Sequence, residues 1–190
     1  MRTIDRITSV REIGIRLQPR SRAVVFALAF VIPAILVAAK SLRLGGAATL
    51  AQSFNLSRLR LAVTLAPDSP DTHASLGSYY LYSPEDLAPR RAVEQFRRAI
   101  RLNPLQAPFW QGLAKACEAS EDSKCAEHAV ERAVKLSPMT PRVWWEAGVI
   151  SLAGGRTETA LACFRRLLAL DPKYAPAVFR LCPQLDHLAP

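Results

Sequence analysis

The most constraining feature of the sequence is a three-residue pattern that returns at regular intervals. Each instance is a leucine, one further residue and a proline: Leu65-Ala66-Pro67, Leu102-Asn103-Pro104, Leu136-Ser137-Pro138 and Leu170-Asp171-Pro172. The last two steps each span 34 residues and the first spans 37. Because proline ends a helix and a fixed period of this length is typical of stacked helical hairpins, the pattern predicts a repeating, all-helical domain.

Between the prolines, small and bulky residues recur in register. Small residues at matching positions would allow the two helices of a hairpin to approach closely, and aromatic residues would fill the remaining space. The small positions are Gly77, Ala114 and Gly148 on the first helices and Ala92, Ala126 and Ala160 on the second helices. The bulky positions are Trp110 and Trp144 on the first helices and Phe96 and Phe164 on the second helices.

This pattern resembles the tetratricopeptide-repeat (TPR) family over about a hundred residues. The departures are His73 at the first bulky position, Cys117 and Ser151 at an aromatic position, and Leu167 at a small one. The resemblance implies an all-α TPR solenoid of about three helical-hairpin repeats within 67–172. The predicted repeats are 70–104, 107–138 and 141–172, the first with three extra residues in its turn.

Helical segments flank the predicted repeats on both sides. Residues 47–66 read as one N-terminal flanking helix, joined to the preceding segment through Gly45-Gly46. Residues 173–190 are predicted to form a C-terminal capping helix and tail, with the helix stopping at Pro183. A cap of this kind covers the last apolar face of a solenoid, because an isolated repeat cannot bury its own surface.

A purely apolar run near the start predicts a transmembrane helix or signal anchor at 23–41. Residues 23–39 carry no charge, and as a helix they would span roughly 25 Å, close to a hydrocarbon core of about 30 Å. Arg22 and Lys40 bracket the run and can extend toward the headgroups, while Pro33 lies in its middle. A cleavable signal peptide is the alternative, because Val37-Ala38-Ala39 and Thr49-Leu50-Ala51 both carry small residues where a signal peptidase requires them.

The basic residues around this run predict its orientation. Six arginines precede it, Arg2, Arg6, Arg11, Arg16, Arg20 and Arg22, whereas Lys40, Arg43, Arg58 and Arg60 follow it. This excess favours a cytoplasmic N-terminus and an exported domain. Residues 1–22 also show a three-to-four-residue apolar period between arginines, which predicts a basic amphipathic segment on an anionic membrane face. A mitochondrial presequence and a frayed polar tail are the alternatives.

The family resemblance implies a concave groove lined by the first helices, which takes up a protein or peptide partner. Carried over by position, the groove residues are Ser78, Tyr82, Gln111, Lys115, Arg142, Trp145, Glu146 and Val149. Trp145 is the candidate anchor for a ligand, because Trp144 is accounted for by the core. The alternative is that Trp145 packs on an adjoining helix.

The cysteines and charges limit the chemistry that the chain can carry. Cys117 and Cys125 lie equally far from a helix turn, so in an exported domain we predict a disulfide between them; the alternative is two small buried side chains. Cys163 and Cys182 are expected in the core.

No motif predicts an enzyme, a metal site, a cofactor or a small-molecule substrate. Basic residues on the second helices lack interleaved exposed aromatics, which disfavours nucleic acid.

These observations predict a membrane-anchored scaffold for protein–protein interaction. Its architecture resembles bacterial inner-membrane proteins with one N-terminal span and a periplasmic TPR domain, which assist the assembly of envelope or membrane complexes. Two alternatives remain open at this point. One is a cytoplasm-facing adaptor that recruits soluble partners to a membrane, and the other is an accessory subunit of a polysaccharide- or lipid-processing membrane enzyme.

Overall fold

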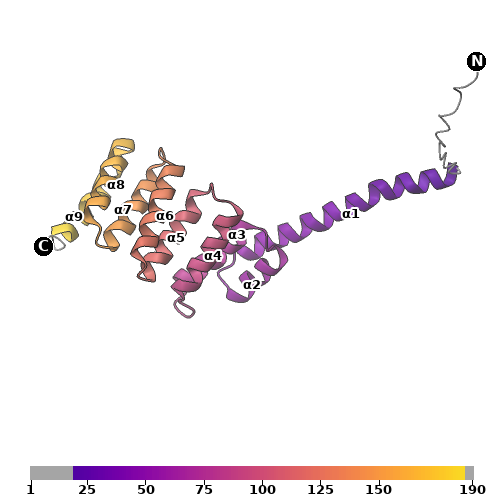
Figure 1. The fold of residues 1–190 in the computed structure, drawn as a ribbon, viewed down its shortest axis with the longest axis horizontal. Coiled ribbons are helices and arrows are strands. Elements are labelled where there is room, and N and C mark those ends of the chain that lie inside the picture. The colour runs from indigo at the N-terminus through magenta and orange to yellow at the C-terminus, as the bar shows by residue number, and fades with distance from the viewer. Residues whose placement is uncertain (1–18, 187–190) are drawn as a thin grey trace, which may run out of the picture. The chain divides into compact units, whose positions relative to one another are not determined.

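The computed structural model describes residues 19–186 and divides the chain into two units, residues 1–42 and 43–190. Among the described residues every regular element is a helix (Figure 1). Most of the amphipathic segment predicted at 1–22 lies outside these residues. In the first unit, the described residues belong to α1 (Pro19–Ala51), whose side chains from Ala29 to Leu42 are all exposed.

Helix α1 is longer than the sequence predicted. The stretch Ala29–Ala51 is long and apolar enough to cross a membrane, with Pro33 inside the helix. The helix runs on through Gly45-Gly46, so the predicted joint there and the single helix at 47–66 are wrong. The break comes at 52–55 instead, because Asn55 caps α2 (Leu56–Leu65) by accepting a hydrogen bond from the backbone N–H of Arg58 at 3.2 Å.

Three helical hairpins follow and stack in chain order through the second unit (Figure 1). Their helices are α3 (Pro70–Tyr82) with α4 (Pro89–Leu102), α5 (Ala107–Ala119) with α6 (Ser123–Leu136), and α7 (Pro141–Ala153) with α8 (Thr157–Leu170). The predicted all-α solenoid is confirmed. We call α3, α5 and α7 the inner helices and α4, α6 and α8 the outer helices.

One hydrogen bond is repeated in all three hairpins. Trp110 Nε1 donates to the carbonyl of Pro104 at 2.8 Å, and Trp144 Nε1 donates to that of Pro138 at 2.8 Å. In the first repeat His73 Nε2 lies 3.0 Å from the carbonyl of Pro67. The imidazole therefore reproduces the contact of the larger indole, which explains how His73 can stand at a bulky position.

Close packing of inner on outer helices depends on two glycines. A Cβ added at Gly148 would come within 2.4 Å of the ring of Phe164, in the same hairpin. A Cβ at Gly112 would come within 2.2 Å of the ring of Phe96, which belongs to the preceding hairpin. Both rings are almost fully buried. The core is thus continuous between repeats, as a solenoid requires.

Matching turns join the inner and outer helices of the second and third repeats. Gly155 and Glu121 occupy the same repeat position and both have positive φ, 70° and 62°. Glycine adopts this left-handed backbone freely, whereas glutamate does so at a cost. In the first repeat the turn is longer and is held by a hydrogen bond from the hydroxyl of Tyr79 to Asp86 Oδ2 at 2.9 Å.

Flanking helices cover both ends of the hairpin stack. At one end Ala62 and Ala66 pack with Ala47 in a small apolar cluster. At the other end α9 (Ala175–Asp186) buries Val178 against α8. The helix includes Pro183, so the predicted stop there is wrong. The side chain of Cys182 lies outside the described residues.

Candidate functional site

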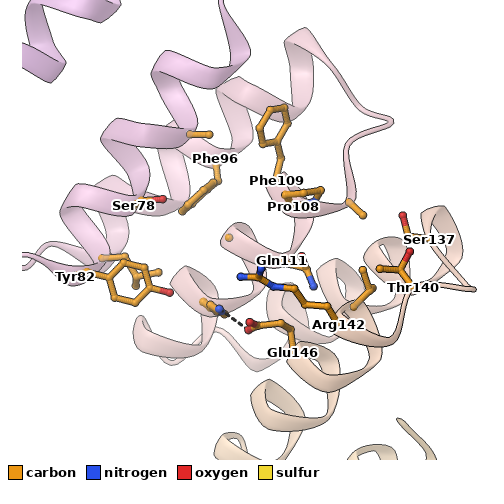
Figure 2. A pocket seen from close by; sticks show the side chains of 16 residues that line it. Ser78, Tyr82, Phe96, Pro108, Phe109, Gln111, Ser137, Thr140, Arg142 and Glu146 are labelled. Atoms are coloured by element: carbon orange, nitrogen blue, oxygen red, sulfur yellow. Dashed lines mark ion pairs between the residues drawn. The ribbon is translucent and has the colours of Figure 1, made fainter. Parts of the chain in front are cut away.

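The inner helices line an elongated groove of about 530 Å³ (Figure 2). On each inner helix, residues four positions apart face this surface, while residues between them face the core. The walls of the groove come from all three hairpins. Its lining includes the predicted residues Ser78 and Tyr82 from α3, Gln111 and Lys115 from α5, and Arg142 and Glu146 from α7. The structure therefore brings six of the eight predicted residues to this one groove.

A second groove of about 490 Å³ adjoins the first at the C-terminal ends of the inner helices. It shares Leu81, Tyr82 and Lys115 with the first groove and adds the predicted Val149. Its lining is mostly apolar, with Glu118 as its acidic member. The two together give a continuous surface on which the first groove carries most of the polar side chains and the second is mostly apolar.

Two ion pairs join the second repeat to the third, one between inner helices α5 and α7 and one between α5 and the turn before α8. Lys115 Nζ lies 2.5 Å from Glu146 Oε2, and Arg156 Nη2 lies 2.6 Å from Glu118 Oε2. Burial alone would lower the pKa of Lys115, but the hydrogen bond to Glu146 and the interaction with Tyr82 outweigh it, so the pKa is raised. Lys115 therefore stays cationic, and its charge is already balanced by Glu146.

Unpaired donors remain in the first groove. Gln111 Nε2 is buried and has no hydrogen-bond partner among the described residues. Arg142 is exposed, and within residues 19–186 no ion pair involves its guanidinium. An amide and a guanidinium without acceptors are suited to carbonyl or carboxylate oxygens of a bound chain.

Trp145 does not line either groove, which corrects its assignment as the ligand anchor. Its ring lies 5.9 Å from that of Phe164 and 5.8 Å from that of Tyr174, both C-terminal to α7 in sequence. Trp145 is half-buried in this cluster, as the alternative interpretation proposed. The reason is that Tyr174, in the segment after α8, and Phe164 on α8 provide aromatic surface against which the indole packs.

Sequence reasoning missed part of the groove floor. Phe96 lines it although it belongs to an outer helix, because Gly112 opposite has no side chain to cover the ring. Pro108 and Phe109, at the start of α5, also line it. The pairing of a bulky residue in one repeat with a glycine in the next was the available signal for Phe96.

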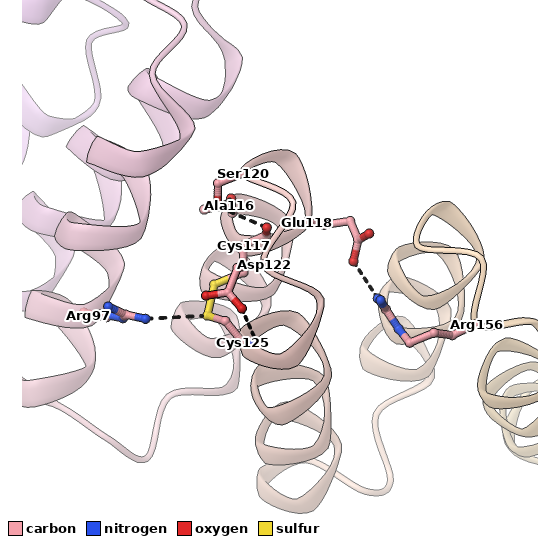
Figure 3. Close-up of a disulfide and its surroundings, with 8 residues drawn as sticks. All are labelled: Arg97, Ala116, Cys117, Glu118, Ser120, Asp122, Cys125 and Arg156. Atoms are coloured by element: carbon pink, nitrogen blue, oxygen red, sulfur yellow. Dashed lines mark hydrogen bonds and ion pairs between the residues drawn. A yellow bond between two sulfur atoms is a disulfide. The ribbon is translucent and has the colours of Figure 1, made fainter.

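The structure joins Cys117 and Cys125 as a disulfide, with their Cα atoms 5.7 Å apart (Figure 3). The bond ties the end of inner helix α5 to the start of outer helix α6, around the turn that contains Glu121. Cys117 is fully buried, and Cys125 lies 3.9 Å from Arg97 Nη2. Cys163 is a buried free thiol whose pKa is raised by burial, so it is poorly reactive.

We compared the chain with known protein families, with curated proteins and with solved structures. A tetratricopeptide-repeat family model matches residues 119–175, which cover α6, α7 and α8. Over these residues the chain is similar to tetratricopeptide repeats. No curated protein matches the sequence. Within the described residues, no group of three or more His, Cys, Asp or Glu side chains could hold a metal ion.

Solved TPR structures share the fold at low sequence identity. The crystal structure of MamA has a TM-score of 0.53 and 23% identity, over 64% of this chain and 69% of MamA. A MamA double mutant has a TM-score of 0.53 and 17% identity, over 62% and 65% of the two chains. YrrB, described as a TPR protein with an unusual peptide-binding site, has a TM-score of 0.51 and 21% identity, over 64% and 61%.

Proposed function

We propose that this chain is a membrane-anchored TPR scaffold whose inner groove binds a segment of a partner protein during assembly of an envelope or membrane complex. The observation that supports this proposal is the groove itself, which holds a buried amide without a partner at Gln111 and the exposed guanidinium of Arg142, next to the mostly apolar second groove at Val149 and Ile150. An extended peptide or a helix offers the matching features, namely backbone carbonyls and apolar side chains. The peptide-binding site of YrrB on the same fold supports this assignment.

The membrane anchor in this proposal is helix α1. Its exposed side chains include Phe30, Ile35 and Leu36, each with at least 60% of its surface accessible. In water such a row of apolar side chains would be unfavourable, whereas hydrocarbon accommodates it without cost. A bilayer is therefore the solvent that suits Ala29–Ala51.

We further propose that the TPR domain is exported, into the periplasm of a bacterial cell. Two independent features support this side of the membrane. The basic residues are in excess before the apolar run, which retains the N-terminus in the cytoplasm. The Cys117–Cys125 disulfide needs an oxidising compartment to form and persist.

Groove binding is tested with peptides selected from a displayed random library against the full chain. Tyr82 lines both grooves and is 56% exposed, so Tyr82→Ala removes binding surface at little cost in stability. We expect about a tenfold loss of affinity, the size of a moderate anchor residue. The matched control is Phe179→Ala on α9, which is 66% exposed and outside both grooves. Equal affinities for Tyr82→Ala and the wild type would contradict the proposal.

Sidedness is tested by fusing alkaline phosphatase after Pro190, because this enzyme is active only where its own disulfides form. We expect activity in the full chain. Moving three arginines from before the apolar run to after it is the matched control, and it should abolish the activity. Activity of a cytoplasmic reporter at the same position would assign the domain to the cytoplasm instead.

A further inference from the structure

Outer helix α4 carries an unusual concentration of positive charge. Its fourteen residues include Arg90, Arg91, Arg97, Arg98 and Arg101, with Glu94 as the single acidic residue. All five arginines are exposed. None of them takes part in an ion pair within the part of the chain that the structure describes. We call these five residues the arginine face.

The helical period gathers these side chains on one side of α4. At 100° per residue, Arg90, Arg97 and Arg101 form one row that also contains Glu94, and Arg91 and Arg98 lie beside it. The five arginines fall within an arc of about 120°, which keeps a net charge of +4 with Glu94 counted (five minus one). The opposite side of α4 is buried, through Ala92, Val93, Phe96, Ala99 and Ile100. The face is therefore fixed by the core and cannot turn away from solvent.

Local contacts hold two of the five guanidinium groups in place. Arg91 lies over the ring of Tyr80, 5.8 Å from its centroid, and Arg97 approaches Cys125 at 3.9 Å. An exposed leucine flanks α4 on each side in the sequence: Leu87, 62% exposed, precedes the helix, and Leu105, 73% exposed, follows it. Cationic groups between exposed apolar side chains are the composition of a surface that lies at a lipid headgroup layer.

We propose that the arginine face docks on anionic lipid headgroups of the membrane in which the chain is anchored. This inference rests on the proposed anchoring by Ala29–Ala51. Guanidinium groups complement lipid phosphates in charge and in geometry. Because the domain continues directly from the apolar helix, the bilayer surface is always at high local concentration, and a weak interaction suffices to hold the domain down.

Nucleic acid is the competing anionic partner, and the structure favours lipid. Single-stranded nucleic acid is bound through aromatic side chains on which bases stack. The aromatic residues next to the arginine face are not available for this: Tyr80 and Phe96 are buried. Exposed Leu87 and Leu105 add apolar surface that suits a lipid interface and not a phosphate backbone.

The expected strength follows from the contribution of one basic residue near an anionic bilayer, about fivefold in the docking equilibrium. Three neutralised arginines should therefore shift that equilibrium about a hundredfold. The test variant is Arg90→Gln/Arg98→Gln/Arg101→Gln, which leaves the contacts of Arg91 and Arg97 intact. The matched control is Lys135→Gln/Arg165→Gln/Arg166→Gln, which removes three cations from α6 and α8.

The full chain is reconstituted into nanodiscs of phosphatidylcholine, with or without phosphatidylglycerol, that carry a dansyl lipid. Energy transfer from the three tryptophans, all in the TPR domain, to the dansyl headgroup measures docking. We expect strong transfer only in anionic discs, a decrease as salt is added, loss in the test variant and retention in the control. Circular dichroism confirms equal helix content in both variants.

Three results would overturn the docking inference. Transfer that is the same in neutral and anionic discs removes the role of lipid charge. Equal loss in the two triple variants removes the role of α4. Displacement from anionic discs by single-stranded RNA at equal phosphate concentration assigns the face to nucleic acid. Chain recovered outside the discs overturns the anchor and the docking together, whereas chain inside the discs with no docking leaves the anchor intact.

Discussion

Inner and outer helices of this solenoid differ in charge although they alternate along the same chain. The inner helices carry Lys115 and Arg142 against Asp71, Glu118 and Glu146, a net charge of −1. The outer helices carry ten basic and four acidic residues, a net charge of +6. Both sets bury the same kind of apolar core, so the fold does not require this difference.

The contrast fits the separate roles that we propose for the two surfaces. On the inner surface the charges are few, Lys115 is paired across helices, and the remaining donors face a groove. On the outer surface the charges lie in solvent, and within the described residues of these helices the one ion pair is Lys135–Glu131. We propose that the inner surface makes specific contacts with a partner, and that the outer surface attracts negatively charged groups over a longer range through its positive charge.

The largest expected effect concerns Phe96, an outer-helix residue whose ring forms part of the inner groove floor. Phe96→Ala should lower the free energy of unfolding by about 3–5 kcal/mol, because it empties a packed site between two repeats. Urea unfolding followed by circular dichroism measures the loss. Phe179→Ala, at an exposed position, should change stability by less than about 0.5 kcal/mol. Similar losses in the two variants would show that the inner and outer layers do not share a core.

The disulfide between inner α5 and outer α6 should have the next largest effect. Closing so short a loop stabilises a fold by about 2.5 kcal/mol in the chain-entropy model. Cys117→Ala/Cys125→Ala should lose that amount in urea unfolding. Adding a reductant should destabilise the wild type to the level of this variant and leave the variant itself unchanged. A wild type that does not respond to reductant would show that the thiols are unpaired.

The smallest expected effect concerns the turns that connect the two layers. Glu121→Gly should raise the free energy of unfolding by about 1 kcal/mol, because glycine adopts the left-handed backbone without strain. Gly155→Ala, at the equivalent position of the next repeat, should lower it by about 1 kcal/mol. Thermal unfolding of both variants measures the two changes in stability. Changes of the same sign would mean that the two turns differ in backbone conformation.

The positions of the repeats could be predicted from the sequence, because several local signals, namely the prolines and the small residues, agree on each of them. Pro104, Pro138 and Pro172 each follow the end of an outer helix at a fixed interval, and the alanines and glycines between them allow the close helix packing that a hairpin needs. The groove residues on α3, α5 and α7 followed from the same register, since inner-helix positions repeat with the hairpins.

The errors fall where tertiary context overrides a local signal. Gly45-Gly46 is a weak helix stretch, yet α1 continues through it and ends only before the Asn55 cap. Trp145 differs from Trp144 by one position, and only the packing of Phe164 and Tyr174 decides that it joins the core. Phe96 in the groove floor depends on Gly112 of the next repeat, a contact that no single-repeat pattern contains.

Site-specific photocrosslinking in intact membranes tests the central claim most directly. A photoreactive residue is placed at Ser78 or Val149 on the inner surface, and at Glu127 or Leu161 on the outer surface, with the chain tethered by its own helix. The account predicts a discrete protein adduct from both inner positions and none from the outer positions. Adducts from the outer positions alone would contradict it, because the partner would then bind outside the inner groove.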